Sequence, residues 1–208
     1  MPLSKSSIFW TIGIVGATVL IMLLGLQILE NKSAGKPAET IADPSNLPGL
    51  QTGDAPWEAE IANLAGRLKA IGLPALSAEG TVLHIHQHLD LFVNGQPVAV
   101  PALIGINQAA GFISPIHVHD TSGIIHVESP IQQTFTLGQF FDIWGVRFTA
   151  QCIGGYCSNA TSTLKVYSNG TLYGGDPRML PLTEHEEIVV VYGAPPATLP
   201  TYTFPSGY

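Results

Sequence analysis

An alternation of histidine and aliphatic residues is the sequence feature that most constrains how this chain can fold. His84, His86 and His88 are separated by single residues, and Asp90 continues the series. Most residues of the other parity are apolar: Leu83, Ile85, Leu89, Leu91 and Val93. Because successive side chains of a strand point to opposite faces, this segment predicts a strand with three imidazoles on one face. Asn94-Gly95 follows directly and predicts a hairpin turn.

A second histidine cluster lies in the segment 114–129, which contains His117, His119, His126 and Glu128. A hairpin that turns at residues 121–122 places His117 opposite His126, and all four side chains then share one face. A register shifted by one residue would send His126 to the other face and break the set. Hairpin chemistry therefore predicts three imidazoles and a carboxylate close together.

A metal ion explains such clusters, because neighbouring imidazoles repel one another when protonated and gain nothing in an apolar core. An HxH pair with a third histidine from the next strand is a common way to hold Zn²⁺ or Cu²⁺. The predicted metal ligands are His117, His119, His126, His84, His86 and His88. The predicted supporting carboxylates are Asp90, Asp120 and Glu128. Nitrogen and carboxylate donors suit zinc, copper(II), nickel or iron(II), and we expect copper or zinc.

Two points about the histidines stay open at this stage. The two clusters form either a single site, which can be dinuclear, or two separate sites. An alternating polar strand is also commonly a solvated face that binds no metal. His185, isolated among acidic residues, is expected to be an exposed surface residue.

The remaining pattern predicts an α+β fold, with a hairpin-rich antiparallel or mixed sheet and one or two short helices. Asp54 is expected to cap a helix whose apolar residues are Trp57, Ile61, Leu64 and Leu68. Thr136 is expected to cap a second helix over residues 137–144, closed by Gly145. Further strands are predicted within 146–150, 164–170 and 186–193, and the proline-rich tail 194–208 is expected to be irregular.

The N-terminal region predicts a membrane anchor. Ile8–Leu29 is a run of 22 residues without a charge, long enough to cross a hydrocarbon core of about 30 Å. Lys5 before it favours a cytoplasmic N-terminus. The alternative is a cleaved signal peptide with a small-residue site at 33–35, which would make the chain secreted. The expected organisation is an anchor at 1–30, a flexible linker at 31–54 and an extracytoplasmic domain at 55–208.

The two cysteines support an extracytoplasmic location. Cys152 and Cys157 flank a short segment that contains two glycines. In an oxidising compartment such a pair predicts a small-loop disulfide, and the alternative is a buried free pair.

The charge balance argues against a nucleic-acid partner. The chain has 8 Lys+Arg against 15 Asp+Glu, a formal charge of −7, and its basic residues do not cluster as a phosphate-binding surface requires. It also has no phosphate-binding loop and no GxSxG motif.

Three blocks resemble a set of uncharacterised bacterial and archaeal proteins that usually carry one N-terminal membrane segment. The blocks are HxHxxLxLxVNG at 84–95, PxHxHDTSGxIHxES at 115–129 and FTLGQFF at 135–141, and the resemblance extends over about residues 82–192. This family has no assigned activity, so the resemblance implies no catalytic roles. The order of elements is also similar to the β-grasp layout, a likeness of fold that carries no function.

Three functions are compatible with these observations. The first is a membrane-anchored metal-binding protein for storage, for delivery or as an accessory to a membrane protein complex. The second is a metalloenzyme in which His117, His119 and His126 hold the metal and Glu128 or Asp120 acts as the base. The third is a metal-free module that binds a partner or senses pH through histidines with an unperturbed pKa of about 6.5.

Overall fold

The computed structural model describes residues 44–208 of the chain. The predicted anchor at 8–29 and most of the predicted linker lie outside the described residues. Within residues 44–208, none of the helices has the length and apolar character needed to span a bilayer.

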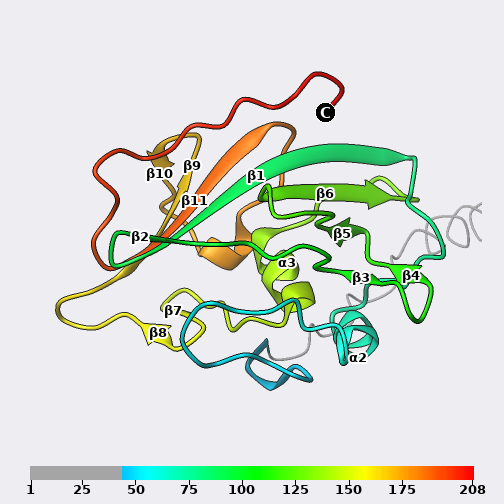
Figure 1. The fold of residues 1–208 in the computed structure, drawn as a ribbon, viewed down its shortest axis with the longest axis horizontal. Coiled ribbons are helices and arrows are strands. Elements are labelled where there is room, and N and C mark those ends of the chain that lie inside the picture. The colour runs from blue at the N-terminus through cyan, green and yellow to red at the C-terminus, as the bar shows by residue number, and fades with distance from the viewer. Residues whose placement is uncertain (1–43) are drawn as a thin grey trace, which may run out of the picture. The chain divides into compact units, whose positions relative to one another are not determined.

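A seven-stranded mixed sheet organises the described part of the chain (Figure 1). Its strands are β1 (Leu83–Val93), β2 (Gln96–Val98), β5 (Ile116–His117), β6 (Ile124–Ser129), β9 (Leu164–Ser168), β10 (Thr171–Leu172) and β11 (Glu186–Tyr192). Their order is β10-β9-β11-β1-β6-β5, and β2 also pairs with β1. The long strand β1 runs parallel to β11 and antiparallel to β6 and β2. The predicted α+β class with a mixed sheet is confirmed, and the β-grasp likeness stays a prediction.

The smaller elements connect and cover this sheet. They are the 3-10 helices η2 (Pro44–Asn46) and η3 (Pro177–Met179), the helices α2 (Leu64–Ala70) and α3 (Leu137–Trp144), and the short strands β3 (Ile106–Asn107), β4 (Phe112–Ile113), β7 (Cys152–Ile153) and β8 (Tyr156–Cys157). The pairs β3-β4 and β7-β8 form two separate two-stranded sheets.

Helix α3 lies against one face of the sheet and builds the core with it (Figure 1). Thr136 and Gln139 form a capping box at its start, and Gly145 ends it with a left-handed φ of 80°, as the sequence predicted. The aliphatic parity of β1 and the matching residues of its neighbours face this helix. The main sheet residues of the core are Leu89, Leu91, Ile125, Val127, Ile188 and Val190. The opposite face of the sheet carries the histidines.

The hairpin between β1 and β2 forms as predicted. Asn94 and Gly95 have φ values of 50° and 78°, the left-handed backbone that a two-residue hairpin turn of this type requires. Val93 pairs with Gln96 on either side of the turn.

The first predicted helix is shorter than expected. Helix α2 begins at Leu64, and Asp54 does not cap it. Trp57 instead lies in an irregular segment, where it is buried against Trp144 at a ring-centroid distance of 6.1 Å. Its indole N–H donates to the carbonyl of Gly53 at 3.0 Å. This tertiary contact buries the tryptophan without a helix, so the helical spacing of the apolar residues was misleading there.

Two further expectations need correction. Residues 146–150 form isolated bridges instead of a strand, with Val146 next to Gln51 and Phe148 next to Ile153. Residues 44–54, which sequence placed in the linker, pack on the folded unit. Leu47 is buried in the core, and Gln51 donates its backbone N–H to the carbonyl of Gly145 at 2.7 Å.

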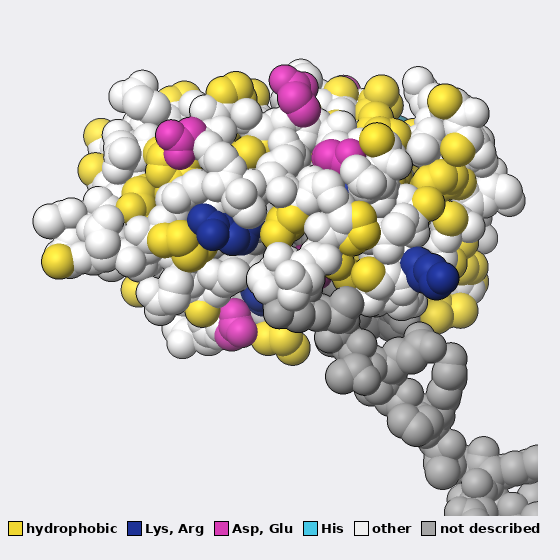
Figure 2. Space-filling model, turned by 90° about the horizontal axis from the view of Figure 1, so that it is seen from below, with side chains coloured by type: hydrophobic (Ala, Val, Ile, Leu, Met, Phe, Trp, Pro, Cys, Tyr) yellow, Lys and Arg dark blue, Asp and Glu magenta, His cyan; other side chains and the backbone are white. Residues whose placement is uncertain are grey.

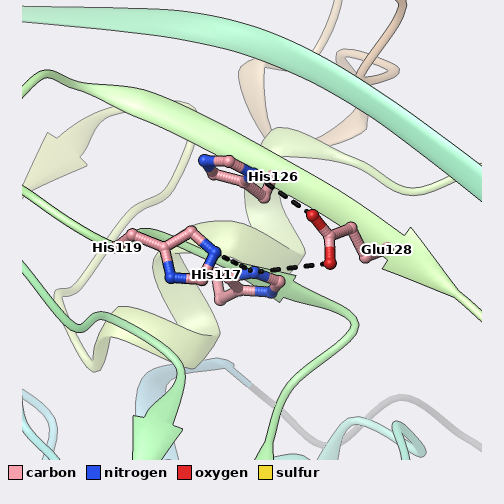
Figure 3. Close-up of side chains that lie close together, drawn as sticks. All are labelled: His117, His119, His126 and Glu128. Carbon is pink, nitrogen blue, oxygen red and sulfur yellow. Dashed lines mark hydrogen bonds and ion pairs between the residues drawn. The ribbon is translucent and has the colours of Figure 1, made fainter. Parts of the chain in front are cut away.

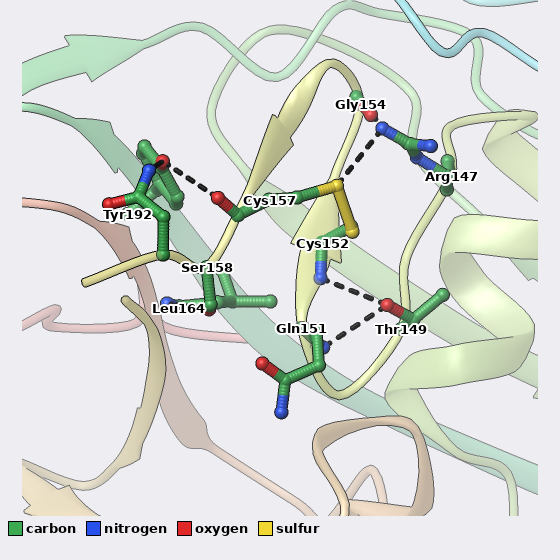
Figure 4. The surroundings of a disulfide bond; sticks show 10 residues. Arg147, Thr149, Gln151, Cys152, Gly154, Cys157, Ser158, Leu164 and Tyr192 are labelled. Carbon is green, nitrogen blue, oxygen red and sulfur yellow. Dashed lines mark hydrogen bonds between the residues drawn. A yellow bond between two sulfur atoms is a disulfide. The ribbon is translucent and has the colours of Figure 1, made fainter. Parts of the chain in front are cut away.

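The predicted disulfide is confirmed: Cys152 and Cys157 are bonded, across the β7-β8 hairpin (Figure 4). Arg147 donates from Nε to the carbonyl of Gly154 at 2.7 Å, inside the same small loop. Thr149 Oγ1 accepts the backbone N–H of Cys152 at 2.9 Å. The bond therefore joins a loop that is also held by polar contacts.

The molecular face on the helix side carries few basic residues. Figure 2 shows its lysine and arginine side chains set apart from one another among hydrophobic and neutral groups. This face therefore offers no continuous basic surface.

Candidate metal centre

The structure brings most of the predicted ligands together on the outer face of the sheet. Three groups of residues offer ligand atoms, and within each group these atoms all lie within 4.8 Å of one another. The first group is His117, His119, His126 and Glu128; the second is His84, His86 and Glu128; the third is His88, Asp90 and Glu187. The first two groups share Glu128, so they form one continuous surface, which we call the histidine face.

Strand register explains why the first two groups are neighbours. His117 of β5 pairs with His126 of β6, as the hairpin argument predicted, and His126 pairs in turn with His86 of β1. His84 pairs with Glu128 two residues further along the same two strands. Three adjacent strands thus align imidazoles in a row across the sheet.

The predicted hairpin ends earlier than expected. Strand β5 stops at His117, because the backbone N–H of Val118 donates to the carbonyl of Ile104 at 3.0 Å and not to β6. His119 therefore stands in the loop and does not pair with Ile124, yet its ring still lies 4.5 Å from that of His126.

Asp120 serves the turn and not the histidine face. Its Oδ1 accepts the backbone N–H of Ser122 at 2.8 Å, and its side chain belongs to none of the three groups. Gly123 continues the turn with a φ of 83°, and a Cβ there would lie 2.8 Å from the carbonyl oxygen of Leu89. The loop can approach β1 so closely because this position is glycine.

The first group has the geometry of a ligand set (Figure 3). His117 donates from Nδ1 to the carbonyl of Ser114 at 3.0 Å, which directs its Nε2 to the cluster. That Nε2 lies 3.1 Å from Nε2 of His119 and 4.0 Å from Oε2 of Glu128. Two nitrogens of one tetrahedral zinc ion, each about 2.0–2.1 Å from the metal, lie about 3.3 Å apart. The two imidazoles are therefore spaced as ligands of one ion would be.

The protonation states in this group suit metal binding. Burial lowers the pKa of His117 to about 4, so the ring is neutral at neutral pH and its Nε2 carries a lone pair. Burial of Glu128 favours the neutral acid, but its hydrogen bond with His126 and its electrostatic interactions with His117 and His84 outweigh this effect. Together they lower the pKa of Glu128 to about 2. Glu128 is therefore a carboxylate.

The second group lies beside the first on β1. His84 Nε2 is 3.2 Å from His86 Nε2 and 3.2 Å from Glu128 Oε1. Burial, then repulsion from His126 and His84, lowers the pKa of His86 to about 4. Nδ1 of His86 is buried and has no hydrogen-bond partner among the described residues. A histidine that served only to hold the fold would have its buried nitrogens paired.

The third group is a different kind of contact. His88 Nε2 lies 2.9 Å from the carbonyl oxygen of Ser122, which can only accept, so Nε2 carries a proton. His88 Nδ1 lies 2.9 Å from Oε2 of the buried Glu187. Burial opposes charge on the ring, but the hydrogen bond and charge of Glu187 raise the pKa of His88. Burial raises the pKa of Glu187 as well, although the hydrogen bond and charge of His88 oppose this shift. Both nitrogens of His88 are thus occupied by protein partners.

The C-terminal tail lies over the histidine face, which sequence reasoning missed. Figure 1 shows the tail passing along the side of the sheet opposite α3. The Tyr202 ring is stacked on that of His88 with centroids 3.7 Å apart, and the Tyr208 ring lies 4.9 Å from that of His86. The tail is irregular, as predicted, but its aromatic residues at 202, 204 and 208 were the signal that it covers a surface.

Two acidic residues near the histidines were also missed. Glu187 pairs with His88 across β1 and β11, and the alternation in β11 places it on the outer face. Glu79 approaches His119, with Oε1 3.5 Å from Nε2. Its position before β1 carried no signal in the sequence. His185 is half exposed and belongs to none of the groups, as expected of a surface residue.

Comparisons of the chain with protein-family models, with curated proteins and with solved structures found no match. The candidate site therefore rests on its own geometry. The described residues contain His/Glu clusters that can hold a metal ion.

Proposed function

We propose that this chain is a membrane-anchored, extracytoplasmic protein that binds Cu(II) or Zn(II) on its histidine face. The observation that carries the proposal is the convergence of His117, His119, His126 and Glu128 within 4.8 Å. Neutral imidazoles and one carboxylate are donors that both ions accept. Thiolate donors do not compete in the described residues, because both cysteines are in the disulfide.

Exposure of the site favours an exchangeable ion. His117, His126 and Glu128 are buried, whereas the His119 side chain is 42% exposed. An ion at this site would be held by the sheet on one side and approached from solvent on the other. This arrangement fits storage, delivery or service to a membrane protein complex better than a structural ion enclosed in a core.

The location belongs to the same proposal. The uncharged run at 8–29 is long enough to cross a bilayer, and the Cys152–Cys157 disulfide suits an oxidising compartment. Alkaline carbonate washing should leave the chain in the membrane fraction. Protease added outside intact spheroplasts should digest residues 44–208, and protection of that region would contradict the proposed orientation.

Elemental analysis tests the metal directly. The full chain, purified in detergent without a histidine tag, should carry copper or zinc in stoichiometric amount. A triple variant, His117→Ala with His119→Ala and His126→Ala, should lose the ion that this set holds while keeping its circular dichroism spectrum. His185→Ala is the matched control, since it removes a histidine outside the groups, and it should retain the metal. A wild-type chain that holds no metal after loading and dialysis would contradict the proposal and favour a metal-free partner surface.

A further inference from the structure

The second ligand group is not needed by the function proposed above. His84 and His86 are separate from the set His117, His119 and His126, but both sets reach the same carboxylate. The question is what two adjacent histidine sets gain by sharing Glu128.

The carboxylate of Glu128 reaches both sets. Oε1 lies 3.2 Å from Nε2 of His84, and Oε2 lies 4.0 Å from Nε2 of His117. Oε1 also lies 3.3 Å from Nδ1 of His126, a member of the first set, so the carboxylate stands between the two sets. A carboxylate placed in this way can bind one ion through each oxygen. Two-metal sites in proteins hold their ions about 3.5–4 Å apart, a separation that such a bridge spans.

The nitrogen spacing repeats in the second set. His84 Nε2 and His86 Nε2 are 3.2 Å apart, again close to the roughly 3.3 Å expected for two nitrogens on one tetrahedral ion. His86 is buried, and its Nδ1 has no partner among the described residues. His84 stands at the solvent side, with a side chain that is 55% exposed.

From these contacts we infer a dinuclear centre in which Glu128 bridges two divalent ions. His117, His119 and His126 hold one ion, and His84 and His86 hold the other. The inference rests on the proposed metal function and adds a second ion and the bridge. His88 stays outside this centre, because Ser122 and Glu187 occupy its ring nitrogens.

Copper loading of the full chain in detergent tests the second ion. Wild type should bind two Cu(II) per chain by elemental analysis, and His84→Ala should bind one. His84 is exposed, so its loss should leave the fold intact, which circular dichroism checks. His185→Ala, which removes another half-exposed histidine outside the groups, should still bind two. One copper per chain in wild type would overturn the dinuclear centre and leave the proposed function standing, whereas no copper would overturn both.

Electron paramagnetic resonance tests the bridge. Two Cu(II) ions on one carboxylate couple magnetically, so the integrated spin of wild type should fall well below its copper content. The single copper of His84→Ala should give a spin count equal to its copper content. In Glu128→Gln the neutral amide should not bridge, and any copper that remains should also give its full spin count. Two copper ions in wild type with a full spin count would show independent sites and overturn the bridge.

Discussion

His86 and His88 are two positions apart on the same face of β1, yet their pKa values are shifted in opposite directions. His86 is beside β6, among other imidazoles, and its pKa is lowered to about 4. His88 reaches β11, where Glu187 raises its pKa, and its Nε2 donates a hydrogen bond to the carbonyl of Ser122. Period-two alternation therefore selects the face of the sheet, while the neighbouring strand decides whether a histidine has a lone pair available for a metal ion.

Removing each histidine in turn should separate the two roles most clearly. His88→Ala leaves the buried Glu187 without its partner and should lower the free energy of unfolding by about 3 kcal/mol, with no change in metal content. His86→Ala removes a ring whose Nδ1 has no partner, so it should cost only about 1 kcal/mol but reduce the metal bound. Urea unfolding with a chelator present, together with elemental analysis, measures both effects. Metal loss in His88→Ala with its fold intact would contradict the assignment of His88 to a structural role.

Bound metal should raise the free energy of unfolding most in those variants that keep His117, His119 and His126. At a free zinc concentration 100 times the dissociation constant, binding adds about 2.7 kcal/mol to the free energy of unfolding. Wild type and His88→Ala should gain this amount, because their ligands on β5 and β6 are intact. The triple variant of His117, His119 and His126 should gain less, because it keeps only His84, His86 and Glu128 as ligands. Thermal unfolding with zinc and with chelator gives the difference, and equal stabilisation of the triple variant would place the ion elsewhere.

Acid should weaken the chelated protein through the same imidazoles. His86 and His117 have pKa values near 4 when folded, against about 6.5 in an unfolded chain. The unfolded state therefore binds more protons between about pH 6.5 and 4, and stability present above this window is lost as the pH falls through it. Each histidine contributes at most about 1.4 kcal/mol per pH unit. His117→Gln should flatten this loss, and an unchanged slope in unfolding titrations would contradict the assignment.

The opposite holds for His88, whose folded pKa is raised. Its stabilising contribution is present below about pH 6.5 and should be lost as the pH rises through the higher folded value. His88→Gln should therefore change the alkaline side of the stability profile and leave the acid side as it is in wild type.

The two tyrosines of the tail should give the smallest effects. Tyr202→Ala removes the ring stacked on His88 and should cost about 0.5–1.5 kcal/mol of stability, with metal exchange unchanged. Tyr208→Ala uncovers His86 and should speed the transfer of bound metal to a chelator several-fold without lowering the metal content. Stopped-flow chelation measures the rate, and equal rates in the two variants would show that the tail does not limit access.

Local signals were sufficient for several elements. The capping residue Thr136 and the closing Gly145 predicted α3, and Asn94-Gly95 predicted the first hairpin. Each of these signals acts within a few residues, where backbone preference decides the conformation. The pairing of His117 with His126 was predictable for the same reason.

Prediction failed where distant residues competed with local pattern. Trp57 has helical spacing with later apolar residues, but burial against Trp144 holds it in an irregular segment. Gln87 has the parity of the aliphatic residues of β1 and is fully buried with its amide unpaired among the described residues. Nothing within the segment around Trp57 indicates its contact with Trp144, and nothing beside Gln87 indicates that its amide is buried.

From the sequence alone it follows that His84, His86 and His88 share one face of their strand, because side-chain direction in a strand follows from the period of two. The sequence also predicted the short disulfide loop, since Cys152 and Cys157 have a sequence separation of 5. The tertiary structure is needed to place β6 between β5 and β1. This strand order joins the two clusters through Glu128. It likewise paired His88 with Glu187, 99 residues away. Strand order depends on the free energy of the whole sheet, which no local pattern encodes.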